Sequence, residues 1–141
     1  MDPHIAAPWA LDPQLEHDTV AVGDLALSRL LASLDARYPW LILVPRRPGA
    51  VEIVDLGDAD RAALMTEIAA VSRALREITG CAKLNVAALG NVVAQLHVHV
   101  IARRHDDAAW PRPVWGVAPA LAYDAAALDA FVTAVRRSVL T

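Results

Sequence analysis

The chain has 141 residues, enough to bury one hydrophobic core, and we expect a single domain over residues 1–141. Hydrophobic residues make up 56% and charged residues 21%, a balance that excludes a disordered chain. The net charge of −3 argues against binding to a nucleic acid backbone, and no apolar run approaches the ~20 residues of a membrane span.

The first 24 residues predict no regular element, because Pro3, Pro8 and Pro13 interrupt helix and strand alike. The amino-terminal sequence lacks the basic start and apolar run of a signal peptide. Cys81 is the single cysteine, so an internal disulfide is excluded. We therefore expect a cytoplasmic protein.

Two strands are predicted next. Residues 25–34 fit helical and strand periodicity, but turn signals on both sides favour a strand. Residues 40–44, Trp-Leu-Ile-Leu-Val, form a second strand that ends at Pro45. This strand is apolar on both faces, which places it near the centre of the sheet.

Residues 58–78 predict a long helix, with Asp58 as its amino-terminal cap and Gly80 as its carboxyl-terminal cap. Its expected apolar stripe consists of Leu64, Ile68, Val71, Leu75 and Ile78, widened by Met65. Its expected solvated side carries Glu67, Arg73, Arg76 and Glu77.

The second half of the chain predicts a hairpin, a loop and a helix. Strands over residues 83–89 and 95–103 flank the turn signal Gly90-Asn91. Residues 104–123 are rich in Trp and Pro and predict an irregular loop, and Asp124 caps a last helix over 124–140. Since strands and helices do not alternate, we expect an α+β fold with an antiparallel sheet.

The sequence Gln-Leu-His-Val-His-Val-Ile at residues 95–101 places a glutamine and two histidines alternately with apolar residues. In a strand, Gln95, His97 and His99 share one face, about 6–7 Å apart, while the residues between them face the core. This face would present two imidazoles to a single substrate.

Three interpretations fit these histidines. They could be half-buried groups with local partners. They could bind zinc with His105, Asp106 and Asp107, although no tight metal-ligand spacing is present and we predict no metal. They could perform nucleophilic catalysis, because a neutral imidazole attacks phosphorus well and leaves readily afterwards.

At these residues the chain resembles the histidine triad (HIT) family of nucleotide hydrolases and transferases. The family motif is His-φ-His-φ-His-φ-φ, where φ is apolar, and glutamine replaces its first histidine here. The order of elements over residues 25–116 is also similar. The resemblance implies an α+β sheet of about five strands with one long and one carboxyl-terminal helix. It also implies a homodimer, a nucleotide substrate and no required cofactor.

The resemblance assigns roles to seven residues. His97 matches the nucleophile that attacks the α-phosphate and becomes a nucleotidyl-histidine, His99 matches the group that contacts the phosphate or leaving group, and Gln95 orients its neighbours. The nucleotide-binding positions are Asp35 for the ribose, Asn85 after a one-residue gap, and Gly90 with Asn91 for the phosphate or leaving group. The substrate could be a dinucleoside polyphosphate, a phosphoramidate or an adenylylated molecule.

Three departures from the family pattern bear on activity. Gln95 cannot carry a proton, Val92 stands where members often have Ser or Thr, and Trp40 occupies the place of a histidine. These departures keep a second hypothesis open, a nucleotide-binding regulatory dimer with little turnover.

Overall fold

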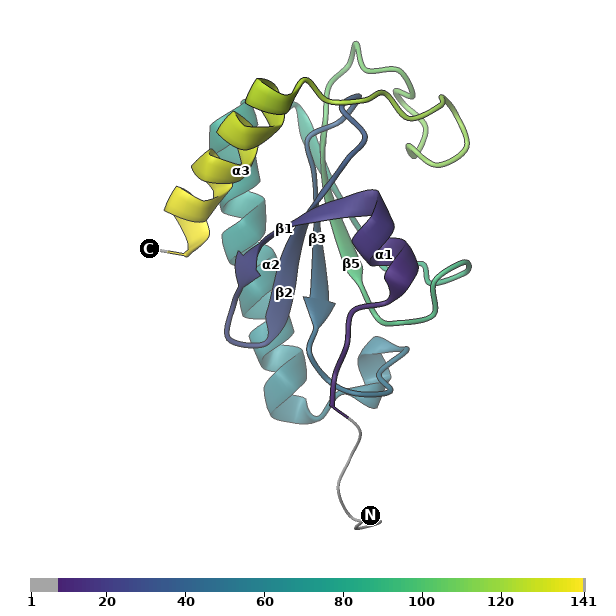
Figure 1. Ribbon diagram of the computed structural model, residues 1–141, viewed down its shortest axis with the longest axis vertical. Helices are drawn as coiled ribbons and strands as arrows, with labels where there is room; N and C mark the ends of the chain where they lie inside the picture. Colours follow the sequence, from purple (N-terminus) through teal and green to yellow (C-terminus); the bar gives the residue numbers. More distant parts are fainter. Residues whose placement is uncertain (1–7, 141) are drawn as a thin grey trace.

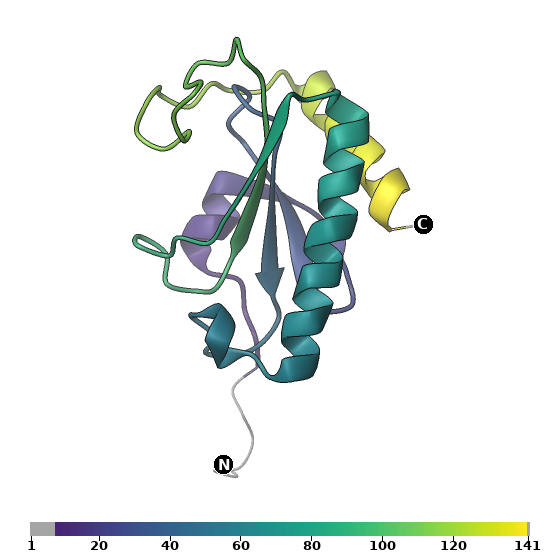
Figure 2. The same ribbon diagram turned by 180° about the vertical axis from the view of Figure 1, so that it is seen from behind.

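The computed structural model describes residues 8–140, which form an antiparallel sheet with α2 and α3 on one face and α1 on the other (Figure 1, Figure 2). The elements are α1 (Pro13–Asp18), β1 (Thr19–Asp24), β2 (Ser28–Ser33), β3 (Trp40–Pro45), η1 (Ile53–Asp55), α2 (Asp58–Thr79), β4 (Lys83–Ala87), β5 (Val98–Arg103) and α3 (Ala125–Val139). The five strands lie in the order β1-β2-β3-β5-β4. The predicted α+β fold is confirmed. Within residues 8–140, no helix combines the length and the apolar character needed to cross a membrane.

The amino-terminal stretch contains two elements, α1 and β1, that the sequence analysis did not predict. The side chain of Asp12 caps α1 by accepting a hydrogen bond of 2.8 Å from the Gln14 N–H. Pro13 occupies the first helical position, where its missing N–H costs nothing. A proline therefore starts this helix instead of preventing it.

Side chains of the central strands alternate between the two faces of the sheet. Leu30 and Leu43 belong to the core under α2 and α3. Leu31 and Ile42 belong to a second apolar cluster, which includes Leu15 of α1. Residues 25–34 do contain a strand, but β2 begins only at Ser28, whose carbonyl accepts the Leu25 N–H across a turn.

The long helix α2 is confirmed over nearly its predicted span. Its predicted stripe faces the core, and Gly80 ends it in the left-handed conformation at φ 61°. The predicted amino-terminal cap is wrong, since Gly57 holds that position and Asp58 lies within the first turn. A carboxylate in the first turn still stabilises the helix, because its negative charge interacts favourably with the helix dipole.

Two side chains of α2 lie where the pattern did not place them. Met65 is 64% exposed instead of widening the stripe. Glu67 was expected on the solvated side but is buried, and its carboxylate accepts hydrogen bonds from the N–H groups of Leu27 and Ser28. These bonds compensate the burial of the charge and tie α2 to the β1–β2 turn.

Strands β4 and β5 are antiparallel neighbours, as predicted, but the expected tight turn is replaced by a longer connection over residues 88–97. Strand β5 begins at Val98, so Gln95 and His97 precede it. The connection bends at Gly90, which adopts φ 75°. This arrangement places residues 89–93 of the connection beside the histidines as one wall of a cavity.

Residues 104–123 form the irregular loop that the sequence predicts, and α3 follows it. The side chain of Asp124 accepts the Ala127 N–H and caps α3, as expected. Val132 and Val135 of α3 are buried against the sheet. Both large helices therefore cover one face, and the opposite face remains available for a site.

Candidate active site

The two motif histidines lie together on the face of the sheet opposite α2 and α3. His99 is paired in register with Ile42 of β3 and Ala87 of β4. Val98 and Val100 point to the other face and belong to the core. His97 and His99 are each only 6% exposed, and their ring centroids lie 4.8 Å apart. The predicted alternation of polar and core-facing residues holds for both histidines.

The backbone fixes which nitrogen of His97 carries its proton. Nδ1 of His97 lies 2.7 Å from the carbonyl oxygen of Gln95. Because a carbonyl only accepts hydrogen bonds, Nδ1 must carry the hydrogen and donate it. In the neutral imidazole Nε2 then keeps its lone pair, which is the form that a nucleophile requires.

His99 is held in the opposite tautomer. The indole Nε1–H of Trp40 donates to Nδ1 of His99 over 3.0 Å, and an indole nitrogen can only donate. The neutral ring of His99 therefore carries its hydrogen on Nε2. Burial, and then the nearby His97, lower the pKa of His99 to about 4. His99 is thus a neutral hydrogen-bond donor at physiological pH.

Trp115 completes the surroundings of His99. Its ring centroid lies 5.0 Å from that of His99 and 5.7 Å from that of Trp40, and both contacts are edge to face. The predicted irregular loop thus places Trp115 against His99. The loop of residues 104–123 therefore contributes directly to the burial of this imidazole.

Replacing Trp40 with Phe is expected to raise the pKa of His99 from about 4 toward the usual value near 6.5. The variant removes the indole N–H that donates to Nδ1 of His99, and it lets water reach the imidazole ring. A titration of the histidine C–H signals by NMR measures the shift.

Trp115→Phe is the matched control, because it thins the aromatic cover and leaves the Trp40 bond in place. Its effect on the pKa of His99 should be clearly smaller. Equal shifts in the two variants would mean that burial alone, and not the indole bond, sets the protonation of His99.

A cavity of about 650 Å³ lies beside the two histidines, within the range of small-molecule sites. Its walls come from α1, β2, β3, the 88–97 connection, β5 and the 104–123 loop. Five of the predicted site residues line it, namely Asp35, Gly90, Asn91, His97 and His99. A second cavity of about 270 Å³ shares Leu89, Gly90 and His97 with the first and extends toward η1.

Asp35 lines the larger cavity, and its carboxylate also holds the surrounding backbone. Oδ1 accepts the N–H of Arg37 at 3.0 Å and the N–H of Leu121 at 3.1 Å. A ribose would therefore share this carboxylate with the loop that follows Trp115. The expected ribose contact remains a prediction.

The remaining two predicted residues do not line the larger cavity. The side-chain oxygen of Asn85 accepts a hydrogen bond of 2.7 Å from the guanidinium of Arg103. The side-chain amide of Gln95 is bonded to the backbone of Ala10 and Asp12, so it does not contact either imidazole through a hydrogen bond. The structure thus does not bring Asn85 together with the histidines, and it gives Gln95 a different partner.

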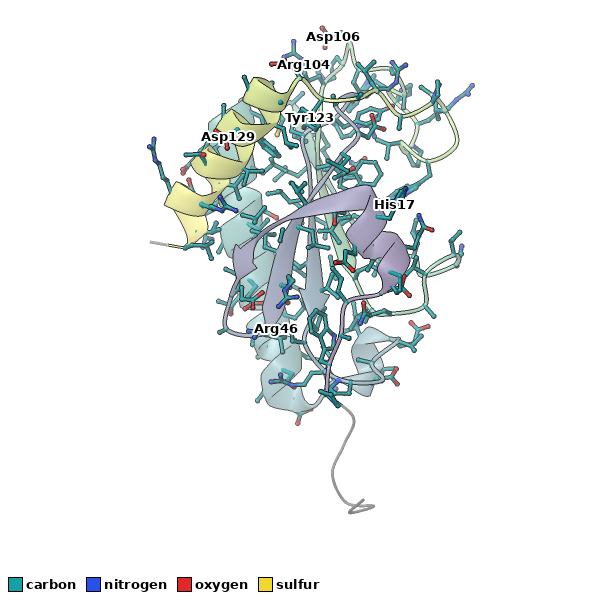
Figure 3. The ribbon with its side chains drawn as sticks, viewed as in Figure 1. His17, Arg46, Arg104, Asp106, Tyr123 and Asp129 are labelled. Carbon is teal, nitrogen blue, oxygen red and sulfur yellow. The ribbon has the colours of Figure 1, made fainter. Side chains whose placement is uncertain are left out.

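Helix α1, which was not predicted, also contributes to the site. Gln14, His17 and Asp18 line the larger cavity, and Figure 3 shows His17 on α1 in front of the sheet. The signal that could have found them was Asp12-Pro13, a cap followed by a first-turn proline.

The zinc interpretation needed His105, Asp106 and Asp107 close to the motif. The structure places His105 against Trp110, pairs Asp106 with Arg104, and pairs Asp107 with Arg103. Within residues 8–140, no group of three or more His, Cys, Asp or Glu side chains is arranged to hold a metal ion.

Comparisons with known proteins agree with this geometry. The HIT domain family matches residues 14–106. A histidine triad protein from Bradyrhizobium japonicum is 61% identical, with a TM-score of 0.93 over 94% of this chain and 99% of that one. One from Sinorhizobium meliloti is 42% identical, with a TM-score of 0.90 over 92% and 96%.

A histidine triad protein from Marinobacter aquaeolei is 37% identical, with a TM-score of 0.92 over 95% of this chain and 98% of that one. No curated protein matches the sequence. The family match covers well over half of the chain, and the similar structures share its whole architecture. The chain therefore belongs to the histidine triad (HIT) family.

Proposed function

We propose that this protein is a nucleotide hydrolase or nucleotidyl transferase that acts at the α-phosphate through a nucleotidyl-histidine on His97. The observation that carries the proposal is the pair of opposed tautomers beside a nucleotide-sized cavity. One neutral imidazole offers a lone pair on Nε2, and its neighbour offers an Nε2–H. Membership of a family of nucleotide-binding proteins supports the same assignment.

In the proposed reaction, Nε2 of His97 attacks the α-phosphorus and forms a P–N bond. The bond to the leaving group breaks, and the leaving group departs with the electron pair and takes a proton from solvent. The Nε2–H of His99 donates a hydrogen bond to a phosphoryl oxygen as charge develops there. Because the pKa of His99 is about 4, it stabilises charge as a hydrogen-bond donor and does not carry a proton to transfer.

Water then attacks the same phosphorus, breaks the P–N bond and releases a nucleoside monophosphate with one proton. An alcohol or amine in place of water would complete a transfer. The carboxylate of Asp35 and the backbone at Gly90 and Asn91 are the proposed contacts of the ribose and phosphate.

The charge of the two cavities supports one class of substrate. Among their described lining residues there is no lysine or arginine, whereas Asp18, Asp35 and Glu52 are acidic. A polyphosphate chain is normally held by cations. We therefore favour a nucleoside phosphoramidate or an adenylylated small molecule over a dinucleoside polyphosphate.

The proposal predicts a covalent adduct that can be weighed. The protein is mixed with an adenosine phosphoramidate, the matching guanosine compound or a dinucleoside triphosphate, and is quenched in alkali, where phosphohistidine survives. An added mass equal to one nucleoside monophosphate is expected, and the phosphoramidates should give the larger fraction. Absence of both adduct and released monophosphate would contradict the proposal.

A nucleotide-binding regulatory dimer with little turnover is the second candidate. Glutamine at the first motif position favours it, since that side chain is bonded to the amino-terminal segment. The exposed edge of β4, with Val86 49% exposed, favours a homodimer in either case. A native mass spectrum that shows a species of twice the chain mass, with bound nucleotide and no covalent adduct, would select this candidate.

The single cysteine fits a cytoplasmic location.

A further inference from the structure

The first position of the motif is connected to the amino-terminal segment in this chain. The side-chain Nε2–H of Gln95 donates to the carbonyl of Ala10 over 2.8 Å, and its Oε1 accepts the N–H of Asp12 over 2.9 Å. A primary amide presents a donor and an acceptor side by side. It therefore pairs with a backbone C=O and N–H two residues apart, as a neighbouring strand would.

The same residue also holds the nucleophile. The backbone carbonyl of Gln95 accepts the Nδ1–H of His97 over 2.7 Å. Gln95 thus contacts the reacting imidazole through its main chain and the amino-terminal segment through its side chain. A histidine ring, whose two nitrogens point in different directions, cannot make both side-chain bonds at once.

The segment that Gln95 holds leads directly into a wall of the larger cavity. Asp12 caps α1, and three of the residues that follow, Gln14, His17 and Asp18, line that cavity. The end of α1 is fixed separately, because the helix runs directly into β1 and the carbonyl of Asp18 accepts the N–H of Leu34. Its one buried side chain is Leu15, which packs with Trp9 and Leu11 over β2 and β3.

We propose that the side chain of Gln95 is a positioning residue that fixes α1 as the specificity-determining wall of the nucleotide site, in place of a catalytic function at this motif position. This inference rests on the proposed function for its substrate. The proposal gives Gln95 two separate roles. Its backbone carbonyl orients the nucleophile His97, and its side-chain amide positions α1 for substrate binding. Loss of the amide should weaken binding and leave the chemical step nearly intact.

Gln95→Met keeps the length of the side chain and removes both hydrogen bonds. We expect KM, and the Kd for AMP or GMP, to rise about tenfold, because two bonds of modest net strength hold the wall in place. The value of kcat should change less than about threefold. Gln95→His, which restores the family motif, should behave like Gln95→Met.

A second pair of variants tests the same contact from the other side. Asp12 has φ −56°, which proline also adopts, so Asp12→Pro removes the N–H without forcing the backbone. Asp12→Ala is its matched control, because it removes the same carboxylate cap and keeps the N–H. Asp12→Pro should raise Kd about tenfold relative to Asp12→Ala, and adding it to Gln95→Met should have little further effect.

Hydrogen exchange tests the contact without any need for turnover. The Asp12 amide and the amides of α1 should exchange faster in Gln95→Met than in the unchanged protein. This result, with the rise in Kd, supports the proposal even where no substrate is turned over. Unchanged exchange at Asp12, unchanged Kd, or a fall of more than about 100-fold in kcat at constant KM would each overturn it.

Discussion

Replacing His97 with Asn is expected to lower turnover at least about 10⁴-fold, because the variant removes the proposed nucleophile and no neighbouring group can substitute for it. His99 cannot take over, since its Nδ1 is bonded to the Trp40 indole and its Nε2 carries the hydrogen. The amide of Asn can still donate to the carbonyl that now holds His97. Nucleotide affinity should therefore change less than about threefold, and the alkali-stable adduct should disappear.

His105→Asn provides the matched control for this substitution. His105 is exposed, contacts Trp110 and does not line either cavity beside the motif. The same exchange of imidazole for amide there should leave kcat and Kd within about twofold. Retention of more than a tenth of the turnover by His97→Asn, or an adduct that persists, would show that another group attacks the phosphorus.

The elements that the sequence predicted best are those whose hydrophobic period is long and whose ends carry strong signals. Helix α2 repeats its apolar residues over many turns and ends at Gly80, which needs a left-handed conformation. Strand β3 is apolar on both faces and lies in the middle of the sheet. Local rules suffice for both, because packing and propensity agree.

Glu67 shows where local rules fail. On a helical wheel Glu67 lies at the edge of the apolar stripe, three residues after Leu64 and four before Val71, and only its charge indicated solvent. Its partners are the N–H groups of Leu27 and Ser28, which lie 40 and 39 positions away in the sequence. A buried carboxylate of this kind becomes visible only when the turn that it caps has been placed in space.

The residues of the candidate site also divide into those that a local pattern places and those whose contacts are distant in the sequence. The predicted alternation placed His97 and His99 together on one face, because a spacing of two residues determines it, although His97 lies just before β5. The partners of Gln95 lie 83 and 85 positions away in the sequence, beyond any local pattern. Asn85 was assigned across a one-residue gap, and its side chain is bonded to Arg103 instead of lining the larger cavity.

The loop that carries Trp115 begins at a buried ion pair. The guanidinium of Arg103 pairs with Asp107 at 2.8 Å and also donates to Asn85. Its Cζ lies over the ring of Tyr38 and over the ring of Trp110, 5.8 Å and 5.6 Å from the ring centroids. The Asp107 carboxylate further accepts the N–H groups of Arg104, Ala109 and Trp110. Both charged side chains are almost completely buried.

Replacing Asp107 with Asn is expected to lower the free energy of unfolding by about 3–5 kcal/mol, because it leaves Arg103 buried without a counter-charge. Urea unfolding at pH 7 measures this loss. Asp106→Asn is the matched control one position away, since Asp106 pairs with Arg104 at the exposed outer end of the loop (Figure 3). No measurable change is expected for it.

The effect of Asp107→Asn should also depend on pH. Burial alone would raise the pKa of Asp107, but hydrogen bonds from Arg103 and from backbone N–H groups lower it to about 2. The carboxylate therefore stabilises the fold fully above its unfolded pKa of 3.8 and loses this contribution as pH falls toward 2.

The difference in unfolding free energy between the unchanged protein and Asp107→Asn should thus shrink by about 2 kcal/mol between pH 5 and pH 2. A difference that stays constant with pH would mean that the packing of Arg103 over two rings, and not the charge of Asp107, holds the loop. In that case Tyr38 and Trp110 would be the residues that keep Trp115 against His99.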